Sequence, residues 1–585
     1  MSTGKKKYVR DDLIRSVFKS YLTVSILSTL AATIGMLVDG IVIGRFLGQE
    51  CVSALGLASP VFILIAAVAG IFSNGGTSLC ANHIGRGDRD RIKLNFTVTS
   101  LATLVTGIVI TIICLIAANP LAVFLGAKDG LVDLTAQYIR GVGAGGIFIM
   151  LSQVLMYYIR MDNDSMLGFV SVIAMTAVNI TLDIVLGIVL KWGMFGMGLA
   201  TSISYVAAFA VCLIHFMRKS NTLKFAKLTG GAAELKQVLF TGIPSALNRA
   251  CLTIRGIALN HLLMALGGSV AVSALAVQNN INQVLSSVTM GVGMTVMLIA
   301  GIFYGERDEA ALGRSLRVSI RTGFVLSCVT AAVTFIFAKP LVSLFLAGKG
   351  DVVALAVRAL RFFTLSLPFS LICVALIYFY QSTRKLVMAN VICIAHALAF
   401  VAAYAFLLSG GFGTDGVWIS FLLAALSTLV LNTVICAVRA KRFPKRLVDI
   451  MMLPDDFEPA KERVLNLSVP NDKNVVMELS QRVGEFCNKY SNDTAKISIL
   501  SRCIEEIVGY IAEHGFSDQK VHYIDLKIIM GEEDIILRIR DNAKPYYVMT
   551  EEGKEVQPEV KMIRDMTKEI HYKNAVGMNN LMVVI

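Results

Sequence analysis

Residues 176–190, "TAVNITLDIVLGIVL", are apolar enough to lie in lipid, yet they include an asparagine and an aspartate. Asn179 and Asp183 are four residues apart, so on a helix both side chains project from one face. An ionisable side chain inside a bilayer is costly and is usually retained for a function. The stretch therefore predicts a membrane helix with a functional polar face.

Hydrophobic runs of similar length recur along most of the chain. The 585 residues are 55% hydrophobic and only 16% charged, which is far from the composition of a soluble domain. About twenty apolar residues span a hydrocarbon core of roughly 30 Å. The sequence predicts an all-α polytopic membrane protein with twelve transmembrane helices. They are expected near residues 20–47, 53–81, 95–118, 132–158, 166–191, 196–217, 237–266, 270–303, 314–337, 353–381, 386–408 and 415–438.

The basic residues are concentrated in alternate loops between these spans. A net charge of +13 could indicate nucleic-acid binding, but this placement follows the positive-inside rule instead. We expect a multi-pass protein of the bacterial cytoplasmic membrane, surrounded by lipid, with both termini in the cytoplasm and no nucleic-acid partner. The basic residues of these loops include Arg10, Arg15, Arg86, Arg91, Arg160, Arg218, Arg307, Arg384 and Arg439.

The membrane region repeats itself after about 220 residues. "VSALGLASP" at 52–60 recurs as "VSALAVQNN" at 272–280, and "GDRD" at 87–90 recurs as "GERD" at 305–308. Six spans per repeat is an even number, so both halves enter the membrane in the same orientation. Transporters built from such parallel repeats open alternately to each side around a central cavity.

This repeat divides the membrane region into an N-lobe, residues 1–225 with spans one to six, and a C-lobe, residues 226–447 with spans seven to twelve. Only two carboxylates, Asp39 and Asp183, fall deep inside the predicted spans, and both belong to the N-lobe. The predicted topology places both at roughly 12 to 14 Å from the outer surface. The same layer contains Tyr138, Asn179 and Thr201.

Two carboxylates that are close together in a low dielectric do not both stay charged without a partner. The pair therefore predicts a site for the coupling ion, H⁺ or Na⁺, and Na⁺ could be bound by Asp39, Asn179 and Asp183. Alternatively, both carboxyls are neutral and only hydrogen-bond neighbouring helices. Most of the eleven cysteines are dispersed through apolar runs, so neither disulfides nor a resident metal or other cofactor is expected.

The C-lobe has no matching carboxylates, but it contains a deep arginine and a run of amides. Arg255 and Asn248 share one face of span seven, and "QNNINQ" at 278–283 lies in span eight. These groups could line a substrate cavity, in which Arg255 would favour an acidic or zwitterionic group. Alternatively, Arg255 snorkels or bonds backbone carbonyls, and the amides join helices. The candidate cavity residues are Asn248, Arg255, Gln278, Asn279 and Asn282.

Several motifs resemble those of the multidrug and toxic compound extrusion (MATE) transporters. "MLVDGIVIGRFLG" at 36–48, "GRGDRD", "NITLD" and "GMGLATSIS" occur in the order of that family, over roughly residues 15–440. The resemblance implies an antiporter in which inward flow of H⁺ or Na⁺ drives export of organic small molecules. It also implies the N-lobe cation site of the DinF-like branch. That site would consist of Asp39, Tyr138, Asn179, Asp183 and Thr201.

Two other functions remain open. The chain could be a flippase for lipid-linked precursors or polysaccharides from the same superfamily, which Arg255 would suit. It could also be a membrane sensor that signals through its C-terminal region. No GxxxxGK[ST] phosphate loop occurs in the sequence, which argues against a primary pump. We therefore expect a transporter and not an enzyme.

Residues 455–585 have the composition of a soluble domain, which we expect in the cytoplasm. "ISILSRCIEEIVGYIAEHG" at 497–515 has the pattern of an amphipathic helix. "YIDLKII" at 523–529 and "DIILRIRD" at 534–541 alternate like half-buried strands. The pattern predicts a small α+β domain.

From residue 465 onward the domain resembles the GHKL-type ATPase domain of anti-sigma-factor kinases. The resemblance implies that Glu506 would activate the attacking group and that Asp541 would bind adenine. The Mg²⁺-binding position, however, is Tyr510, and the second glycine motif is reduced to "VGMNN" around Gly577. Loss of the metal ligand damages phosphoryl transfer above all. We expect a degenerate domain that binds ATP or a cytoplasmic regulatory protein, without ATP hydrolysis.

Overall fold

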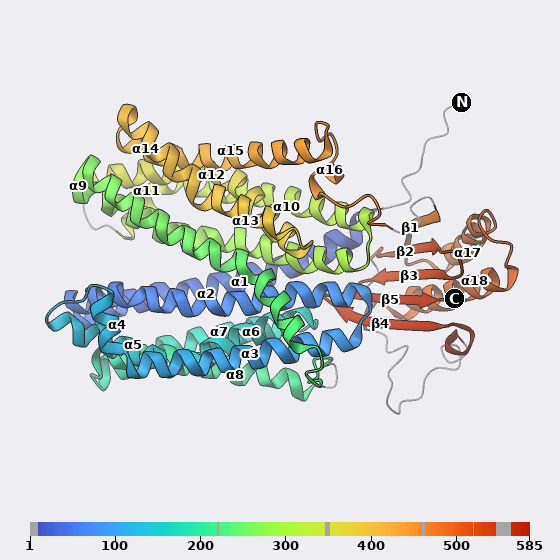
Figure 1. Cartoon of the computed structure of the whole chain (residues 1–585), viewed down its shortest axis with the longest axis horizontal. Coiled ribbons are helices and arrows are strands. Elements are labelled where there is room, and N and C mark those ends of the chain that lie inside the picture. The colour runs from blue at the N-terminus through green and yellow to red at the C-terminus, as the bar shows by residue number, and fades with distance from the viewer. Residues whose placement is uncertain (1–9, 219–220, 346–350, 459–462, 519, 546–562) are drawn as a thin grey trace.

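The computed structural model describes residues 10–218, 221–345, 351–458, 463–518, 520–545 and 563–585. Figure 1 shows long helices in two groups, blue to cyan for the N-lobe and green to orange for the C-lobe, with a small sheet domain at one end. We call this end of the helices, against which residues 463–585 dock, the domain end.

Within its described residues, 10–218 and 221–225, the N-lobe contains ten helical segments. They are α1 (Asp12–Val42), η1 (Ile43–Leu47), α2 (Gln49–Arg86), α3 (Arg89–Ile116), α4 (Ala118–Phe124), α5 (Gly130–Ala144), α6 (Gly146–Met161), α7 (Ser165–Leu182), η2 (Asp183–Val189) and α8 (Gly193–Met217). The segments written η are π-helical.

The C-lobe follows with a similar set. Its segments are α9 (Gly231–Gly305), α10 (Glu309–Ile336), α11 (Ala338–Ser343), α12 (Asp351–Ser382), α13 (Leu386–Ile394), η3 (Ala395–Ala399), α14 (Phe400–Phe412) and α15 (Thr414–Ala440). The short α16 (Leu447–Met451) leads into the C-terminal domain.

Ten of the described helices are long and apolar enough to cross a membrane, or eleven if the bent pair α5 and α6 forms one span. That pair meets at an angle of 48°. Helix α9 has 75 residues, and its backbone leaves the helical region at Gly267 and Gly268. A straight helix of this length would measure about 110 Å, several times the thickness of a hydrocarbon core. The expected count of twelve spans stays a prediction.

The repeated loops "GDRD" and "GERD" use the same capping chemistry. Asp88 accepts a hydrogen bond from the Arg91 backbone N–H at 3.0 Å and starts α3, while Asp308 does the same for Ala311 at 3.0 Å and starts α10. A carboxylate at this position satisfies a backbone donor that the first helical turn leaves free. Gly87 permits the tight turn because its φ of 77° lies in the left-handed region.

Helices α2 and α9 pack closely at the domain end and join the two lobes. A methyl group on Gly85 would lie 2.0 Å from the Ile302 carbonyl oxygen, and one on Gly305 would lie 2.1 Å from the Asn82 carbonyl oxygen. Glycine is therefore required at both positions. The Asn82 side chain also donates a hydrogen bond to the Ser382 carbonyl of α12 at 3.0 Å. The lobes are in direct contact at this end.

The C-terminal domain is a five-stranded antiparallel sheet, in the order β1-β2-β3-β5-β4, with two helices on one face. The expected small α+β domain is confirmed. Its elements are β1 (Val464–Pro470), α17 (Lys473–Cys487), α18 (Thr494–His514), β2 (Tyr523–Met530), β3 (Ile535–Asp541), β4 (Glu569–Ala575) and β5 (Met578–Val584).

The strands differ from expectation in one respect. Apolar residues such as Leu526 pack with α17 and α18, as the alternation predicts. The opposite face, however, is not in water: Lys527 is only 2% exposed and Arg540 only 3%. Charged side chains on this face are buried against the loops at the domain end of the membrane helices.

Candidate ion site and the docked C-terminal domain

The structure brings the two N-lobe carboxylates together through Asn179. The Asn179 amide nitrogen donates to Asp39 Oδ1 at 2.5 Å and to Asp183 Oδ2 at 3.0 Å. The two carboxyls also lie within hydrogen-bonding reach of each other. Asp183 is completely buried and its Oδ1 has no hydrogen-bond partner among the described residues, whereas Asp39 is half-buried.

The backbone contributes to this arrangement. Asp183 is the first residue of the π-helical segment η2, directly after α7. A π-helical turn changes the angle between successive side chains, and such turns are frequent at functional sites. The sequence predicted a regular helix here. Its i to i+4 spacing still placed Asn179 and Asp183 on one face, because the π-helical segment begins only at Asp183.

Tyr138 on α5 and Thr201 on α8 lie beside this pair. Both are 8% exposed, and their hydroxyls lie within hydrogen-bonding reach of each other. The charges of Asp39 and Asp183 act on Tyr138. All five residues of the candidate ion site therefore gather in one region of the N-lobe.

The candidate cavity residues of the C-lobe are less closely grouped. The guanidinium carbon of Arg255 lies 5.3 Å from the centre of the Phe421 ring, a cation–π contact. Asn248 accepts a weak hydrogen bond from Cys393 at 3.8 Å. Gln278 is 1% exposed, and both polar atoms of its amide lack partners among the described residues. Asn279 and Asn282 are half-buried.

Sequence reasoning missed one charged residue between the lobes. Arg249, six residues before Arg255 on α9, is half-buried and forms no ion pair within the described part of the chain. Its charge acts on Tyr157 and Tyr205 of the N-lobe and on Tyr378 of the C-lobe. The sequence did contain a signal for Arg249, because it is a charged residue within an apolar span.

Metal-binding clusters are not found in the part of the chain that the structure describes: no group of three or more His, Cys, Asp and Glu side chains is placed to hold a metal ion. A coupling cation would rely on carboxylate, amide and hydroxyl oxygens of the N-lobe. In the observed rotamer Asn179 turns its nitrogen, not its oxygen, toward both carboxylates.

The C-terminal domain binds the C-lobe through buried ion pairs to the "GERD" loop. Arg540 of β3 bonds Glu306 and, at 2.6 Å, Asp308. Lys527 of β2 lies 3.3 Å from Asp308. Burial opposes the charge of Asp308, but Arg540 and Lys527 outweigh it and hold the pKa of that carboxyl below its usual range. A second pair joins Arg314 of α10 to Asp525 at 3.1 Å.

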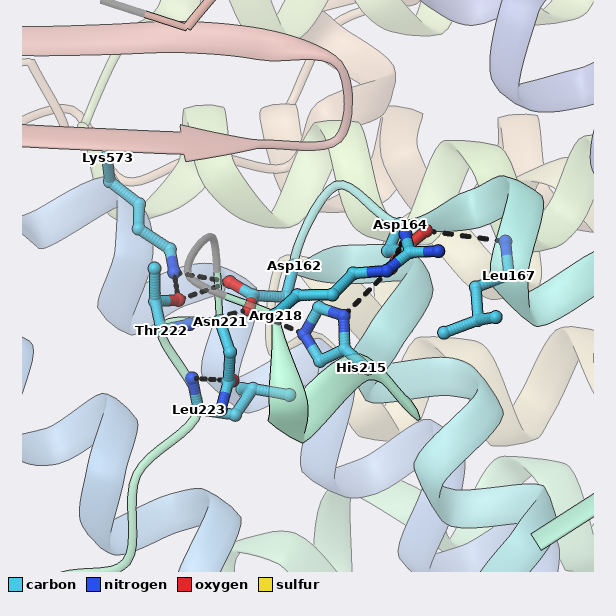
Figure 2. Close-up of polar contacts among 9 residues, drawn as sticks. All are labelled: Asp162, Asp164, Leu167, His215, Arg218, Asn221, Thr222, Leu223 and Lys573. Carbon is cyan, nitrogen blue, oxygen red and sulfur yellow. Dashed lines mark hydrogen bonds and ion pairs between the residues drawn. The ribbon is translucent and has the colours of Figure 1, made fainter. Parts of the chain in front are cut away.

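The domain binds the N-lobe through the hairpin formed by β4 and β5. Figure 2 shows Lys573 of β4 reaching Asp162, which follows α6, at 2.7 Å. Asp162 also bonds His215 of α8 at 2.9 Å and the Thr222 backbone N–H at 2.9 Å. Burial opposes the charge of Asp162, but Lys573 and these hydrogen bonds lower the pKa of its carboxyl to about 2.

The candidate nucleotide residues are engaged in other contacts. Asp541 is fully buried and accepts hydrogen bonds from the Asn579 amide at 2.6 Å and the Ala543 N–H at 2.9 Å. The N–H of Gly577, at the turn between β4 and β5, donates to Asn163 of the N-lobe at 2.7 Å. On α18, Tyr510 stacks on His514 and Glu506 is half-buried.

Comparison with known proteins identifies the membrane region. The family model described as MatE matches residues 25–185 and 244–407. The chain belongs to the MatE family. As a member of this family, it is a membrane transporter and not an enzyme.

Two curated relatives of this MatE chain are multidrug proteins. It is 25% identical over 347 residues to the probable multidrug resistance protein YoeA of Bacillus subtilis (strain 168), covering 57% of this chain and 74% of the relative. It is 24% identical over 415 residues to the multidrug export protein MepA of Staphylococcus saprophyticus, covering 70% and 91%.

A solved transporter structure has a similar fold over most of this chain. It is described as "Reverse polarity of binding pocket suggests different function of a MOP superfamily transporter from Pyrococcus furiosus Vc1 (DSM3638)". The TM-score is 0.68 at 23% identity, and the match covers 74% of this chain and 97% of that one. At this identity the likeness concerns the fold alone.

Proposed function

We propose that this MatE transporter exports organic compounds in exchange for protons that bind at Asp39 and Asp183. The observation that carries the proposal is the Asn179 amide, which donates to both carboxylates. One proton shared by the pair removes the repulsion between two negative charges in a low dielectric. When that proton leaves, the two negatively charged carboxylates repel each other, and this repulsion favours a rearrangement of the N-lobe helices.

The direction of the Asn179 amide favours H⁺ over Na⁺. Sodium is bound by oxygen atoms, so the amide would have to rotate to take part. Tyr138 and Thr201, within hydrogen-bonding reach of each other beside Asp183, can relay a proton through their hydroxyls. This set of residues also supports assignment to the DinF-like branch.

Twelve crossings with both termini in the cytoplasm suit this mechanism. Helix α9 would cross twice, with its turn at Gly267 and Gly268, and the bent pair α5 and α6 would cross once. Each lobe then contributes six spans in the same orientation, as parallel repeats require. The domain end, where the C-terminal domain docks, would face the cytoplasm.

The substrates would carry an acidic or zwitterionic group. Arg249 lies between tyrosines of both lobes, and Arg255 has an aromatic partner but no carboxylate within the described residues. Such arginines attract an anionic group, while tyrosine rings accommodate flat organic molecules. The named relatives are multidrug proteins, so a flippase for lipid-linked precursors is not favoured.

For the C-terminal domain we keep the interpretation of a degenerate GHKL-like fold without ATP hydrolysis. Tyr510 occupies the position where the metal ligand is expected, and Asp541 is bonded inside the sheet. Binding of a nucleotide or a regulatory protein remains a hypothesis, as does a sensor role for the whole chain.

The coupling proposal is tested in proteoliposomes. An imposed proton gradient should drive uptake of a fluorescent dye by the wild type, and Asp183→Asn should abolish it. Asp415→Asn, which removes a half-buried carboxylate of the C-lobe paired with the exposed Arg358, is the control and should transport normally. Equal uptake by wild type and Asp183→Asn would refute the ion site. Uptake driven by a Na⁺ gradient but not by a proton gradient would show that H⁺ is not the coupling ion.

A further inference from the structure

The C-terminal domain contacts both lobes at the place where the lobes meet. On the C-lobe side, Arg540 and Lys527 are buried against Glu306 and Asp308. On the N-lobe side, the tip of the hairpin contacts the segment that follows α6. Between the two, Arg538 of β3 donates to the Gly85 carbonyl of the N-lobe at 3.2 Å and lies 3.8 Å from Glu306 of the C-lobe.

These contacts surround the closest approach of the two lobes. Gly85 of α2 is packed against Ile302 of α9, and Gly305 is packed against Asn82. Opening a path from this end into the space between the lobes requires α2 and α9 to separate here. Any such movement must stretch or break the bonds of a domain that holds both sides.

We propose that the C-terminal domain has a function of its own: it holds the domain ends of the two lobes together and must release the N-lobe for this end to open. The contact that releases is the hairpin junction, residues 573–577 with residues 161–163 and Thr222. This inference rests on the chain being a MatE transporter, but it depends neither on the nature of the coupling ion nor on the substrate.

The C-lobe side of the domain is the fixed side. Residues 447–457 belong to the segment that follows α15 and leads to the domain, and they are packed on the C-lobe. Tyr380 of α12 donates to the Ile450 carbonyl at 2.9 Å, and the Phe457 ring stacks on Tyr304 at 5.3 Å. Separating Arg540 from Glu306 and Asp308 would also leave charges buried without partners. The domain therefore moves with the C-lobe.

The hairpin junction on the N-lobe side is simpler to break. It consists of one ion pair, Lys573 with Asp162, and two backbone donors. Elsewhere the domain is joined to the N-lobe by hydrogen bonds of Arg538 to the Gly85 carbonyl, Asn542 to Ser16, and Arg10 to Ser468 and Tyr523. The Gly577 N–H bonds the Asn163 side chain at 2.7 Å, and the Val576 N–H bonds the Met161 carbonyl at 3.2 Å. Lys573 is 18% exposed, so water can replace its partner. Asp162 keeps His215 and Thr222 when Lys573 leaves.

The test is a distance measurement between spin labels in the full-length protein. Met166→Cys at the start of α7 and Arg439→Cys near the end of α15 are exposed positions at the domain ends of the two lobes. Of the native cysteines only Cys328 is not buried, so it is replaced by alanine. Lys573→Met should raise the fraction of longer distances between the labels about fivefold. The loss of one ion pair can shift the equilibrium between the held and the released state by this factor.

Two variants control for general damage. Lys568→Met removes an exposed lysine that pairs with Asp534 inside the same domain, and it should leave the distances unchanged. Lys573→Arg keeps the charge and should stay close to wild type. An unchanged distance distribution in Lys573→Met overturns the proposal, even if transport changes. So does an equal shift in Lys568→Met. A shift confined to Lys573→Met supports it, and transport by that variant shows that the N-lobe site still functions.

Discussion

The two lobes have the same backbone irregularity in corresponding spans, but they place different chemistry around it. The fifth predicted span of the N-lobe becomes π-helical at Asp183–Val189, and the eleventh, in the C-lobe, does so at Ala395–Ala399. In the N-lobe the irregular turn presents Asp183 to Asp39 through Asn179. In the C-lobe it holds His396, on which the charge of Arg255 acts.

This difference suggests how two lobes with a similar backbone can have different functions. A π-helical turn widens the helix and re-aims side chains, whatever those side chains are. The N-lobe turn presents an acidic group, while the C-lobe turn presents an imidazole near the Arg255 guanidinium. Under the proposed function, the carboxylates of one lobe would bind the coupling proton and Arg255 of the other would attract an anionic group of the substrate.

The largest expected effect is loss of coupling in the N-lobe. Asp39→Asn removes one of the two carboxylates, so gradient-driven dye uptake should fall to the level of empty vesicles. His396→Asn changes the polar side chain that the C-lobe turn holds, and it should retain most of the uptake because His396 belongs to no carboxylate pair among the described residues. Both rates are measured in the same proteoliposome assay. If His396→Asn were as damaging as Asp39→Asn, the proposed division between the lobes would be wrong.

Much of the N-lobe site could be predicted from sequence because it depends on local spacing and on topology. The separation of Asn179 and Asp183 sets their common face, and the direction of each span sets the depth of Asp39. The π-helical turn could not be predicted, since apolar residues suit an α-helix equally well. Arg249 was missed because its neighbours Tyr157 and Tyr378 come from other helices.

The docking of the C-terminal domain could not be predicted for a different reason. The alternation of apolar and polar residues in β2 and β3 identified the face that carries Lys527 and Arg540. Charged residues normally face water, so this face was expected to be exposed. Their partners, Glu306 and Asp308, are distant in sequence, and the "GERD" loop resembled an ordinary turn between two spans. Nothing local indicates that two polar surfaces will meet.

An intermediate effect is expected on substrate choice in the C-lobe. Arg255→Gln removes the charge above Phe421, and uptake of an anionic dye should fall about tenfold relative to a cationic dye, as the loss of one charged hydrogen bond allows. Arg361→Gln is the control, because Arg361 makes a similar contact with Phe335 at 5.2 Å but is exposed. Equal losses for both dyes would mean that Arg255 supports the fold and does not select the substrate.

The smallest effect is expected from pH at the junctions with the C-terminal domain. The pKa of Asp162 is lowered from 3.8 to about 2, and that of Asp308 is also lowered, by Arg540 and Lys527 against burial. A carboxyl whose pKa is lowered by folding stabilises the folded state fully at pH values above its ordinary pKa. This stabilisation is lost as the pH falls through the pKa of the folded state. Neither carboxyl should therefore weaken its junction between pH 5 and 8.

Below about pH 4 the two junctions should separate in order, because Asp162 and Asp308 each stabilise their junction until they are protonated. Burial raises the pKa of Asp525, so the pair of Asp525 with Arg314 is lost earlier and the C-lobe junction then depends on Asp308. Spin labels on Lys520→Cys in the domain and on Met166→Cys or Arg439→Cys in the lobes report each junction. The distance to the N-lobe should change first on acidification, since one cation of the domain, Lys573, is paired with Asp162 among the described residues, while two, Arg540 and Lys527, are paired with Asp308. Release of the C-lobe first would show that the domain is fixed to the other lobe.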